Sequence, residues 1–326
     1  MLWFRRINLT AVLLCFVVVV FGAFVRLSDA GLGCPDWPGC YGHVGVPEAD
    51  HDVAQAQQAF PERPVEAHKA WKEMIHRYLA STLGFLIVAL ALMSTRIKGA
   101  PKKLPWVLVG LVVFQGMLGM WTVTLLLKPL VVTGHLIGGL TTLSLLLVLW
   151  LSGRAHGAAK APRPLIGVAT IGLILVALQI FLGGWTSTNY AALACPDFPT
   201  CHYRLVPETD FKTAFTLWHG LGINYEHGIL DARARVTIHW MHRVGALVVS
   251  LFLLLLAVAL LRCRESVWKH FGQAVLAVLA LQITLGITTV LFQLPLPLAT
   301  AHNAGAALLL STLLALNVRL RQAPPR

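Results

Sequence analysis

The segment CPDWPGC at residues 34–40 returns in the second half of the chain as CPDFPTC at residues 195–201. Both copies keep two cysteines, two prolines, an aspartate and an aromatic residue in the same places. A second motif also recurs, because QGMLGMWT begins at Gln115, QIFLGGWT at Gln179 and QITLGITT at Gln282. Motifs repeated in this way predict a chain built from two copies of one unit.

The composition is too apolar for an ordinary soluble domain, because 57% of the residues are apolar and 12% are charged. A helix needs roughly 20 apolar residues to cross a bilayer, and eight runs approach that length. They cover residues 9–26, 74–95, 104–127, 130–152, 165–186, 237–261, 268–294 and 296–318. Lipid cannot hydrogen-bond to the backbone, so each run is expected to be a helix. The sequence therefore predicts an all-α polytopic membrane protein with eight transmembrane helices.

The repeat divides these eight helices into two sets of four, each with one long loop after its first helix. Because four is an even number, both sets enter the membrane in the same orientation. We therefore predict two tandem four-helix bundles related by a pseudo-twofold axis along the membrane normal. The predicted boundaries are 1–153 for the N-terminal half, 154–164 for a cytoplasmic linker and 165–326 for the C-terminal half.

The net charge of +12 is explained by membrane topology rather than by nucleic-acid binding. Basic residues gather in alternate short loops, as the positive-inside rule requires of cytoplasmic loops. They are Arg5, Arg6, Arg96, Lys98, Lys102, Lys103, Arg154, Lys160, Arg163, Arg262, Arg264, Lys269, Arg319, Arg321 and Arg326. Both termini are thus predicted to be cytoplasmic, with the two long loops outside. The first run shows neither a small-residue cleavage site nor an Arg- and Ser-rich presequence, so we expect a retained first helix in a bacterial inner membrane.

Four histidines lie near the predicted outer ends of the second and fourth helices of each half: His76, His135, His242 and His302. We expect each in the first one or two turns of its helix. Histidines inside a membrane are functional candidates, and two that face each other from separate helices suit the axial positions of a haem iron. Two ligands would underfill a zinc site. Hydrogen bonding between helices is the structural alternative.

The two halves differ three residues before the first histidine, where Glu73 stands in one half and His239 in the other. A spacing of three puts both members on one helix face, so Glu73 is expected beside His76. It could carry protons during chemistry there, or it could be a carboxylate stabilised by the positive end of its helix. Arg77 directly follows His76, and Arg243 directly follows His242. Their guanidinium groups could pair with haem propionates, or they could extend to water.

The cysteines of the two repeated segments, Cys34 with Cys40 and Cys195 with Cys201, lie in loops predicted to be outside the membrane. That compartment is oxidising, so paired cysteines there tend to form disulfides. Each pair either staples its loop or exchanges electrons as a thiol–disulfide couple.

Together the motifs resemble the haem A synthase family, in order and along nearly the whole chain. The resemblance rests on CPDWPGC, EMIHR from Glu73, TGHLIGG around His135, CPDFPTC, INYEHG from Ile223, IHWMHR from Ile238 and AHNAGA around His302. Members of that family oxidise the C8 methyl group of haem O to a formyl group, through an alcohol and a geminal diol. The product, haem A, serves terminal oxidases.

The resemblance implies a role for each matching residue. His242 and His302 would hold a resident b-type haem, and His76 and His135 would line the site of the haem O substrate. Glu73 matches the acid considered important for the reaction, and the two cysteine segments match the loop cysteine pairs of the family.

The partners implied are haem O, the haem O synthase that supplies it, an electron acceptor or donor, and the lipid bilayer. Association of the chain with copies of itself stays open. Two other functions would use the same four histidines without modification chemistry, namely a diheme electron-transfer cytochrome and a haem carrier. Glu73 and the unequal halves favour the enzyme.

Overall fold

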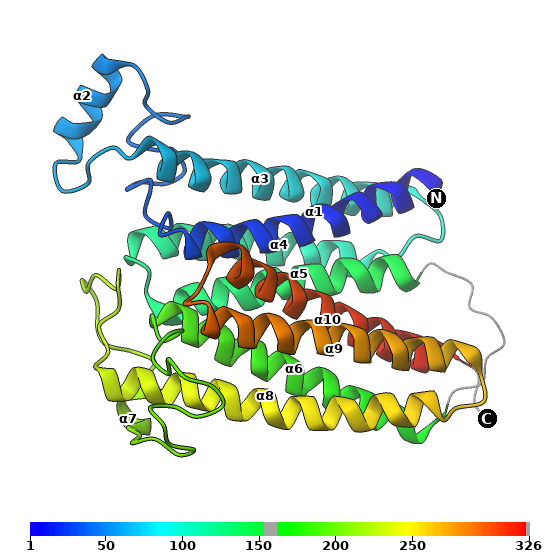
Figure 1. Ribbon diagram of the computed structural model, residues 1–326. Helices are drawn as coiled ribbons and strands as arrows, with labels where there is room; N and C mark the ends of the chain where they lie inside the picture. Colours follow the sequence, from blue (N-terminus) through cyan, green and yellow to red (C-terminus); the bar gives the residue numbers. More distant parts are fainter. Residues whose placement is uncertain (153–161, 324–326) are drawn as a thin grey trace.

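Eight long helices run side by side along the molecule (Figure 1). The structure is a computed structural model that describes residues 1–152 and 162–323. The long helices are α1 (Leu2–Leu27), α3 (Ala67–Arg96), α4 (Lys103–Thr124), α5 (Pro129–Ser152), α6 (Pro164–Thr188), α8 (Ala232–Leu261), α9 (Ser266–Leu291) and α10 (Leu296–Gln322). Each is long and apolar enough to cross a membrane. The prediction of an all-α polytopic membrane protein with eight spanning helices is therefore confirmed.

Two short helices in the loops were not predicted, α2 (Asp50–Ala59) and α7 (Phe211–Ala214). Three long helices begin five or more residues before their apolar runs: α1 starts at Leu2, α3 at Ala67 and α8 at Ala232. Hydropathy marks only the apolar part of a helix, and it does not detect the polar residue that starts one. At α8 this residue is Asp231, whose side chain accepts from the Ala234 N–H at 2.8 Å. His76 and His242 consequently lie in about the third turn of their helices, one turn further from the helix start than predicted.

The helices contact one another in two closed rings. In the first half, α1 touches α3 and α5, and α4 touches the same two helices; in the second half, α6 touches α8 and α10, as does α9. The rings meet through α1 with α10, α5 with α6, and α5 with α10. If each helix is replaced by its equivalent in the other half, the same contacts between the rings result, as a twofold relation requires. The axis itself, the direction of the membrane normal and the half boundaries stay predictions, and most of the predicted linker 154–164 lies outside the described residues.

The seam between the halves is closely packed where α6 crosses α5. A Cβ on Gly184 would lie 3.0 Å from Leu136 Cδ2 and 3.3 Å from Thr133 Cγ2. The hydroxyls of Thr133 and Thr188 lie 3.2 Å apart across the same seam. One apolar core joins both halves, with Leu146 and Leu313 among its fully buried members. The halves are therefore one packed unit rather than two separate bundles.

Both chain ends lie at one end of the bundle, and the two long loops lie at the other (Figure 1). We call these the terminal end and the loop end. Every acidic residue except Glu265 belongs to the loop end, and the short basic loops belong to the terminal end. Arg154, Lys160 and Arg326 of the predicted basic set lie outside the described residues. The charge distribution agrees with the predicted orientation, which remains a prediction.

At the loop end, the long loop of the second half is fastened to the first half. Arg63 and Glu226 form an ion pair at 2.8 Å between the two loops. The ammonium group of Lys128, in the α4–α5 turn, donates to Gly220 O at 2.5 Å and lies over the ring of Trp218. The two loops therefore cover the loop end jointly.

Replacement of Gly184 by leucine should separate α6 from α5, because the new side chain meets Leu136 and Thr133. We expect a loss of about 1–3 kcal/mol, seen as a lower midpoint of thermal unfolding in detergent. Gly167 is the matched control, because a Cβ there on the same helix would meet nothing within 4 Å. Equal midpoints for Gly184→Leu and Gly167→Leu would contradict the packing described for the seam.

Candidate functional site

The structure brings the four predicted histidines together in two pairs, one in each ring of helices. The ring centroids of His76 on α3 and His135 on α5 are 6.5 Å apart, with the ring planes at 85°. The rings of His242 on α8 and His302 on α10 are also 6.5 Å apart and at 85°. Two sites of the same geometry are therefore built from equivalent helices.

Each histidine ring lies against a glycine on the helix that precedes its own among the long helices. A Cβ on the glycine would meet the Cε1 atom of the ring at 2.8–3.5 Å in all four cases. The pairs are Gly22 with His76, Gly119 with His135, Gly183 with His242 and Gly286 with His302. A larger residue at Gly22 or Gly286 would push the ring aside, and one at Gly183 would be tight, whereas a Cβ at Gly119 would make an ordinary contact.

The histidine pairs fit a metal held between two axial imidazoles. With metal–nitrogen bonds of about 2.0–2.1 Å, one nitrogen from each ring would place the centroids roughly 6–6.5 Å apart. The Nδ1 atoms of His76, His135 and His302 are buried and have no hydrogen-bond partner within the described parts of the chain. A buried polar atom left unpaired costs free energy, so these rings are suited to a ligand that the protein does not supply.

The donor set argues for haem iron rather than a bare metal ion. A structural zinc site needs four protein ligands, whereas each pair offers two. Among residues 1–152 and 162–323, one cluster brings three or more metal-ligand side chains together, and it consists of Asp29, Glu226 and His227, outside both pairs. A macrocycle that supplies the remaining ligands is therefore the group that fits two facing imidazoles.

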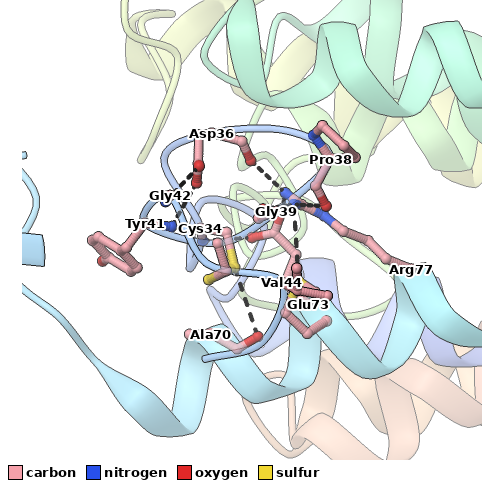
Figure 2. Close-up of a disulfide and its surroundings, with 12 residues drawn as sticks. Cys34, Asp36, Pro38, Gly39, Tyr41, Gly42, Val44, Ala70, Glu73 and Arg77 are labelled. Carbon is pink, nitrogen blue, oxygen red and sulfur yellow. Dashed lines mark hydrogen bonds and ion pairs between the residues drawn. A yellow bond between two sulfur atoms is a disulfide. The ribbon is translucent and has the colours of Figure 1, made fainter. Parts of the chain in front are cut away.

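Glu73, three residues before His76 on α3, is held by the first cysteine loop (Figure 2). Its side chain is 6% exposed, accepts from the backbone N–H of Cys34 at 2.8 Å and forms an ion pair with Arg77. Arg77 also donates to the backbone carbonyls of Asp36, at 3.0 Å, and Gly39. Glu73 and Arg77 thus fasten the loop 34–40 to α3. Glu73 lies one helical turn before His76.

His239 takes the same place in the second half. It is 4% exposed, and its two ring nitrogens lie 3.1 Å from Cys195 N and 3.2 Å from Arg243 Nε. A neutral imidazole has one acceptor nitrogen, so only one of these two contacts is a hydrogen bond. Arg243 donates to the carbonyls of Asp197 and Thr200 at 2.7 Å each. The carboxylate of one half is replaced by an imidazole in the other, in the same structural position.

These contacts give Arg77 and Arg243 a role that the sequence did not predict. Both guanidinium groups donate to backbone carbonyls of a cysteine loop. Pairing of the same groups with haem propionates or with water stays a prediction.

Both cysteine loops are closed by disulfides, Cys34–Cys40 and Cys195–Cys201. The aspartate of each loop accepts from backbone N–H groups that follow the second cysteine, in the case of Asp197 those of His202 at 2.6 Å and Tyr203 at 3.0 Å. The hydroxyl of Thr200 and these two N–H groups lower the pKa of Asp197 to about 2. The loops are therefore rigid covers, built in the same way in both halves.

Comparison with known proteins places the whole chain. The sequence profile of the family described as cytochrome oxidase assembly protein (COX15-CtaA) matches residues 5–314. The heme A synthase of Shewanella oneidensis is 46% identical over 97% of this chain and 95% of its own length. Those of Chelativorans sp. and Caulobacter vibrioides are 30% and 28% identical over 95% and 94% of this chain, and over 88% and 93% of their own lengths.

The chain belongs to the haem A synthase family. The resemblance found in the sequence is thereby confirmed, and with it the class of enzyme, an oxidoreductase concerned with haem.

Three histidines of the loop end had no predicted role in this member of the haem A synthase family. His239 anchors the second cysteine loop, a role that its alignment with Glu73 could have suggested. His227 is exposed and lies beside Tyr190, with ring centroids 6.0 Å apart. His219 is half-buried in the loop fastened by Lys128. Neither His219 nor His227 joins a histidine pair.

Replacement of Gly33 by alanine should detach the first cysteine loop from α3. The new Cβ would lie 2.6 Å from the backbone carbon of Lys69, which cannot rotate away. We expect a loss of about 1–3 kcal/mol and a lower melting temperature in detergent. Gly45→Ala is the control in the same loop, because its Cβ would meet only Tyr78 Oη at 4.0 Å. Identical melting temperatures for the two variants would rule out this contact as a support of the site.

Proposed function

We propose that this protein is a haem A synthase that oxidises the C8 methyl group of haem O to a formyl group. The observation that carries the proposal is the pair of equivalent histidine sites, each at 6.5 Å and 85°, in a chain of this family. Two sites suit an enzyme that binds one haem as substrate and keeps another as cofactor.

We assign His242 and His302 to a resident b-type haem and His76 with His135 to the haem O substrate. When bound, the resident haem supplies electron transfer at the second site. The assignment is supported by the difference between the halves, because only the first site has a carboxylate, Glu73, one turn from its histidine. His239 stands in that position beside the second site and has no carboxylate to take up a proton from the substrate.

The reaction removes hydrogen from the substrate methyl group in two oxidative steps. With water as the oxygen donor, each hydroxylation replaces one C–H bond by C–OH and releases two protons and two electrons, and the electrons pass to the acceptor. The first step gives an alcohol and the second a geminal diol, which loses water to leave the formyl group. Glu73 takes the protons released, through a carboxylate that Cys34 N–H and Arg77 hold in a fixed direction. His76 and His135 orient the substrate, and the disulfide loop covers it from bulk solvent.

We place the protein in a bacterial inner membrane, with both termini in the cytoplasm and both histidine pairs toward the outer side. The basic terminal end and the acidic loop end support this orientation. Haem O would reach the first site from the enzyme that makes it, and an electron acceptor or donor would serve the second site.

A diheme electron-transfer cytochrome is the second candidate, because the two histidine pairs have the same ring geometry. A haem carrier would use the same pairs. Both alternatives leave the bound haem chemically unchanged, so the product of the reaction separates them from a haem A synthase.

Glu73→Gln should abolish haem A formation while haem O still binds. Glutamine can still accept from Cys34 N–H, but it takes up no proton, so we expect product to fall about 10²-fold or more. Co-expression with a source of haem O, followed by chromatography and mass analysis of the extracted haems, measures this. Glu208→Gln, on an exposed loop carboxylate, is the control. Undiminished haem A from Glu73→Gln would overturn the role of Glu73, and haem A absent from the unmodified protein would overturn the function.

Ligation is tested by removing single histidines. His242→Ala or His302→Ala should lose the low-spin spectrum of the resident haem, because one axial bond is gone. His76→Ala should keep that spectrum and lose haem O binding. His51→Ala, on the exposed helix α2, serves as the control. A resident haem spectrum that is the same in His242→Ala as in the unmodified protein would refute the assignment.

A further inference from the structure

Three of the four paired histidines have a glutamine beside them, and the fourth does not. The three glutamines stand one turn before the glycines that contact the histidine rings. They are Gln115 on α4 beside His135, Gln179 on α6 beside His242 and Gln282 on α9 beside His302. The equivalent position on α1, four residues before Gly22, is Val18.

The glutamine side chains are directed at their histidine helices. Gln179 Nε2 lies 3.0 Å from His242 Nδ1 and donates to His242 O at 2.8 Å. Gln282 Nε2 lies 3.5 Å from His302 Nε2. Gln179 and Gln282 thus reach the rings of their histidines, whereas the amide of Gln115 lies against α5 at Gly138, three residues after His135.

A glycine makes room for each glutamine. It stands three residues after the histidine, and a Cβ there would collide with the glutamine amide. The pairs are Gly138 with Gln115, Gly245 with Gln179 and Gly305 with Gln282. After His76 the same position is Leu79. Glutamine and glycine therefore occur together at three sites and are both replaced at the fourth, which marks them as one structural unit.

Each glutamine also keeps a buried amide atom free for the histidine or its ligand. Gln115 Nε2, Gln179 Oε1 and Gln282 Oε1 are buried without a hydrogen-bond partner among the residues that the structure describes. His76 has apolar neighbours instead, with Phe21 at a ring-centroid distance of 6.4 Å and Gly22 against its Cε1.

A polar neighbour decides how firmly a histidine holds a metal. A group that hydrogen-bonds to the ring fixes its orientation and tautomer before the metal binds, and loss of such a partner typically lowers metal affinity about 10–100-fold. A ring without one loses more rotational freedom on binding, so its bond to the iron breaks more readily.

We infer that Gln115, Gln179 and Gln282 are positioning residues for His135, His242 and His302, and that His76 is the axial ligand that opens for haem exchange. The inference rests on the proposed function. The second site, with a glutamine behind both histidines, retains its haem. The first site, with Gln115 behind His135 alone, admits haem O and releases product on the His76 side.

Haem release from the purified full-length protein tests the inference. The protein is co-expressed with a source of haem O and mixed with excess apomyoglobin, and the captured haems are separated by chromatography at successive times. Haem O and haem A report the first site, and haem b reports the second. We expect Gln179→Val to speed the release of haem b about 10-fold or more and to leave the release of haem O unchanged.

The converse variant installs the missing unit. Val18→Gln combined with Leu79→Gly should slow the release of haem O and haem A about 10-fold without changing haem b. If that variant does not fold, Gln115→Val tests the same site, because it should speed the release of haem O about 10-fold. The ferric low-spin electron paramagnetic resonance signal of haem b should also shift in Gln179→Val, since the ring of His242 is no longer held.

The control is Thr170→Val, which removes a polar group from α6 at its contact with Asn317, 2.9 Å away, and touches no paired histidine. It should alter neither the signal nor the release rates. Unchanged haem b release and an unchanged signal in Gln179→Val would overturn the inference, provided that His242→Ala removes haem b. If His242→Ala itself keeps haem b, the ligand assignment of the proposed function fails instead.

Discussion

The guanidinium group that follows the first histidine of each half is the contact on which the rest of the site depends. Arg77 and Arg243 each donate to backbone carbonyls of a cysteine loop. Arg77 also contacts Glu73, and Arg243 contacts His239, one turn before the paired histidine of the same helix. Carbonyls in a disulfide-closed loop cannot all pair with their own backbone, and a planar guanidinium offers five donors in a fixed arrangement. One arginine therefore ties helix, loop and Glu73 or His239 into a single rigid cover.

The same cover allows the halves to differ without changing the fold. Glu73 and His239 both lie below the backbone N–H of the first loop cysteine and beside an arginine. A carboxylate in this position forms an ion pair and can exchange a proton, whereas an imidazole between the same neighbours contributes hydrogen bonding without negative charge. This difference within a duplicated framework thus gives the first half a buried carboxylate where the second half has an imidazole.

The fold and the histidine pairs were predictable because both follow from simple periodicities. Runs of about 20 apolar residues located every spanning helix, and the recurrence of His76 and His135 as His242 and His302 indicated which histidine rings lie together in each half. Hydropathy missed the polar first turns of α3 and α8, since it detects lipid contact rather than helix. The roles of Arg77, Arg243 and His239 depend on where a loop folds back, and loop conformation leaves no periodic signal.

The differences between the halves converge on one histidine. Both pairs keep the same ring separation and angle, so the axial geometry does not explain why one site would exchange its haem and the other would keep it. Glu73 lies one turn from His76 on α3, and Val18, in place of a glutamine, lies on the helix that His76 faces. Glu73 and Val18 thus lie on the two helices that flank His76, and the proposed proton transfer and the proposed ligand release both concern this histidine. The two halves therefore differ most around His76, because His135, His242 and His302 each have a glutamine and a glycine at the equivalent positions, where His76 has Val18 and Leu79.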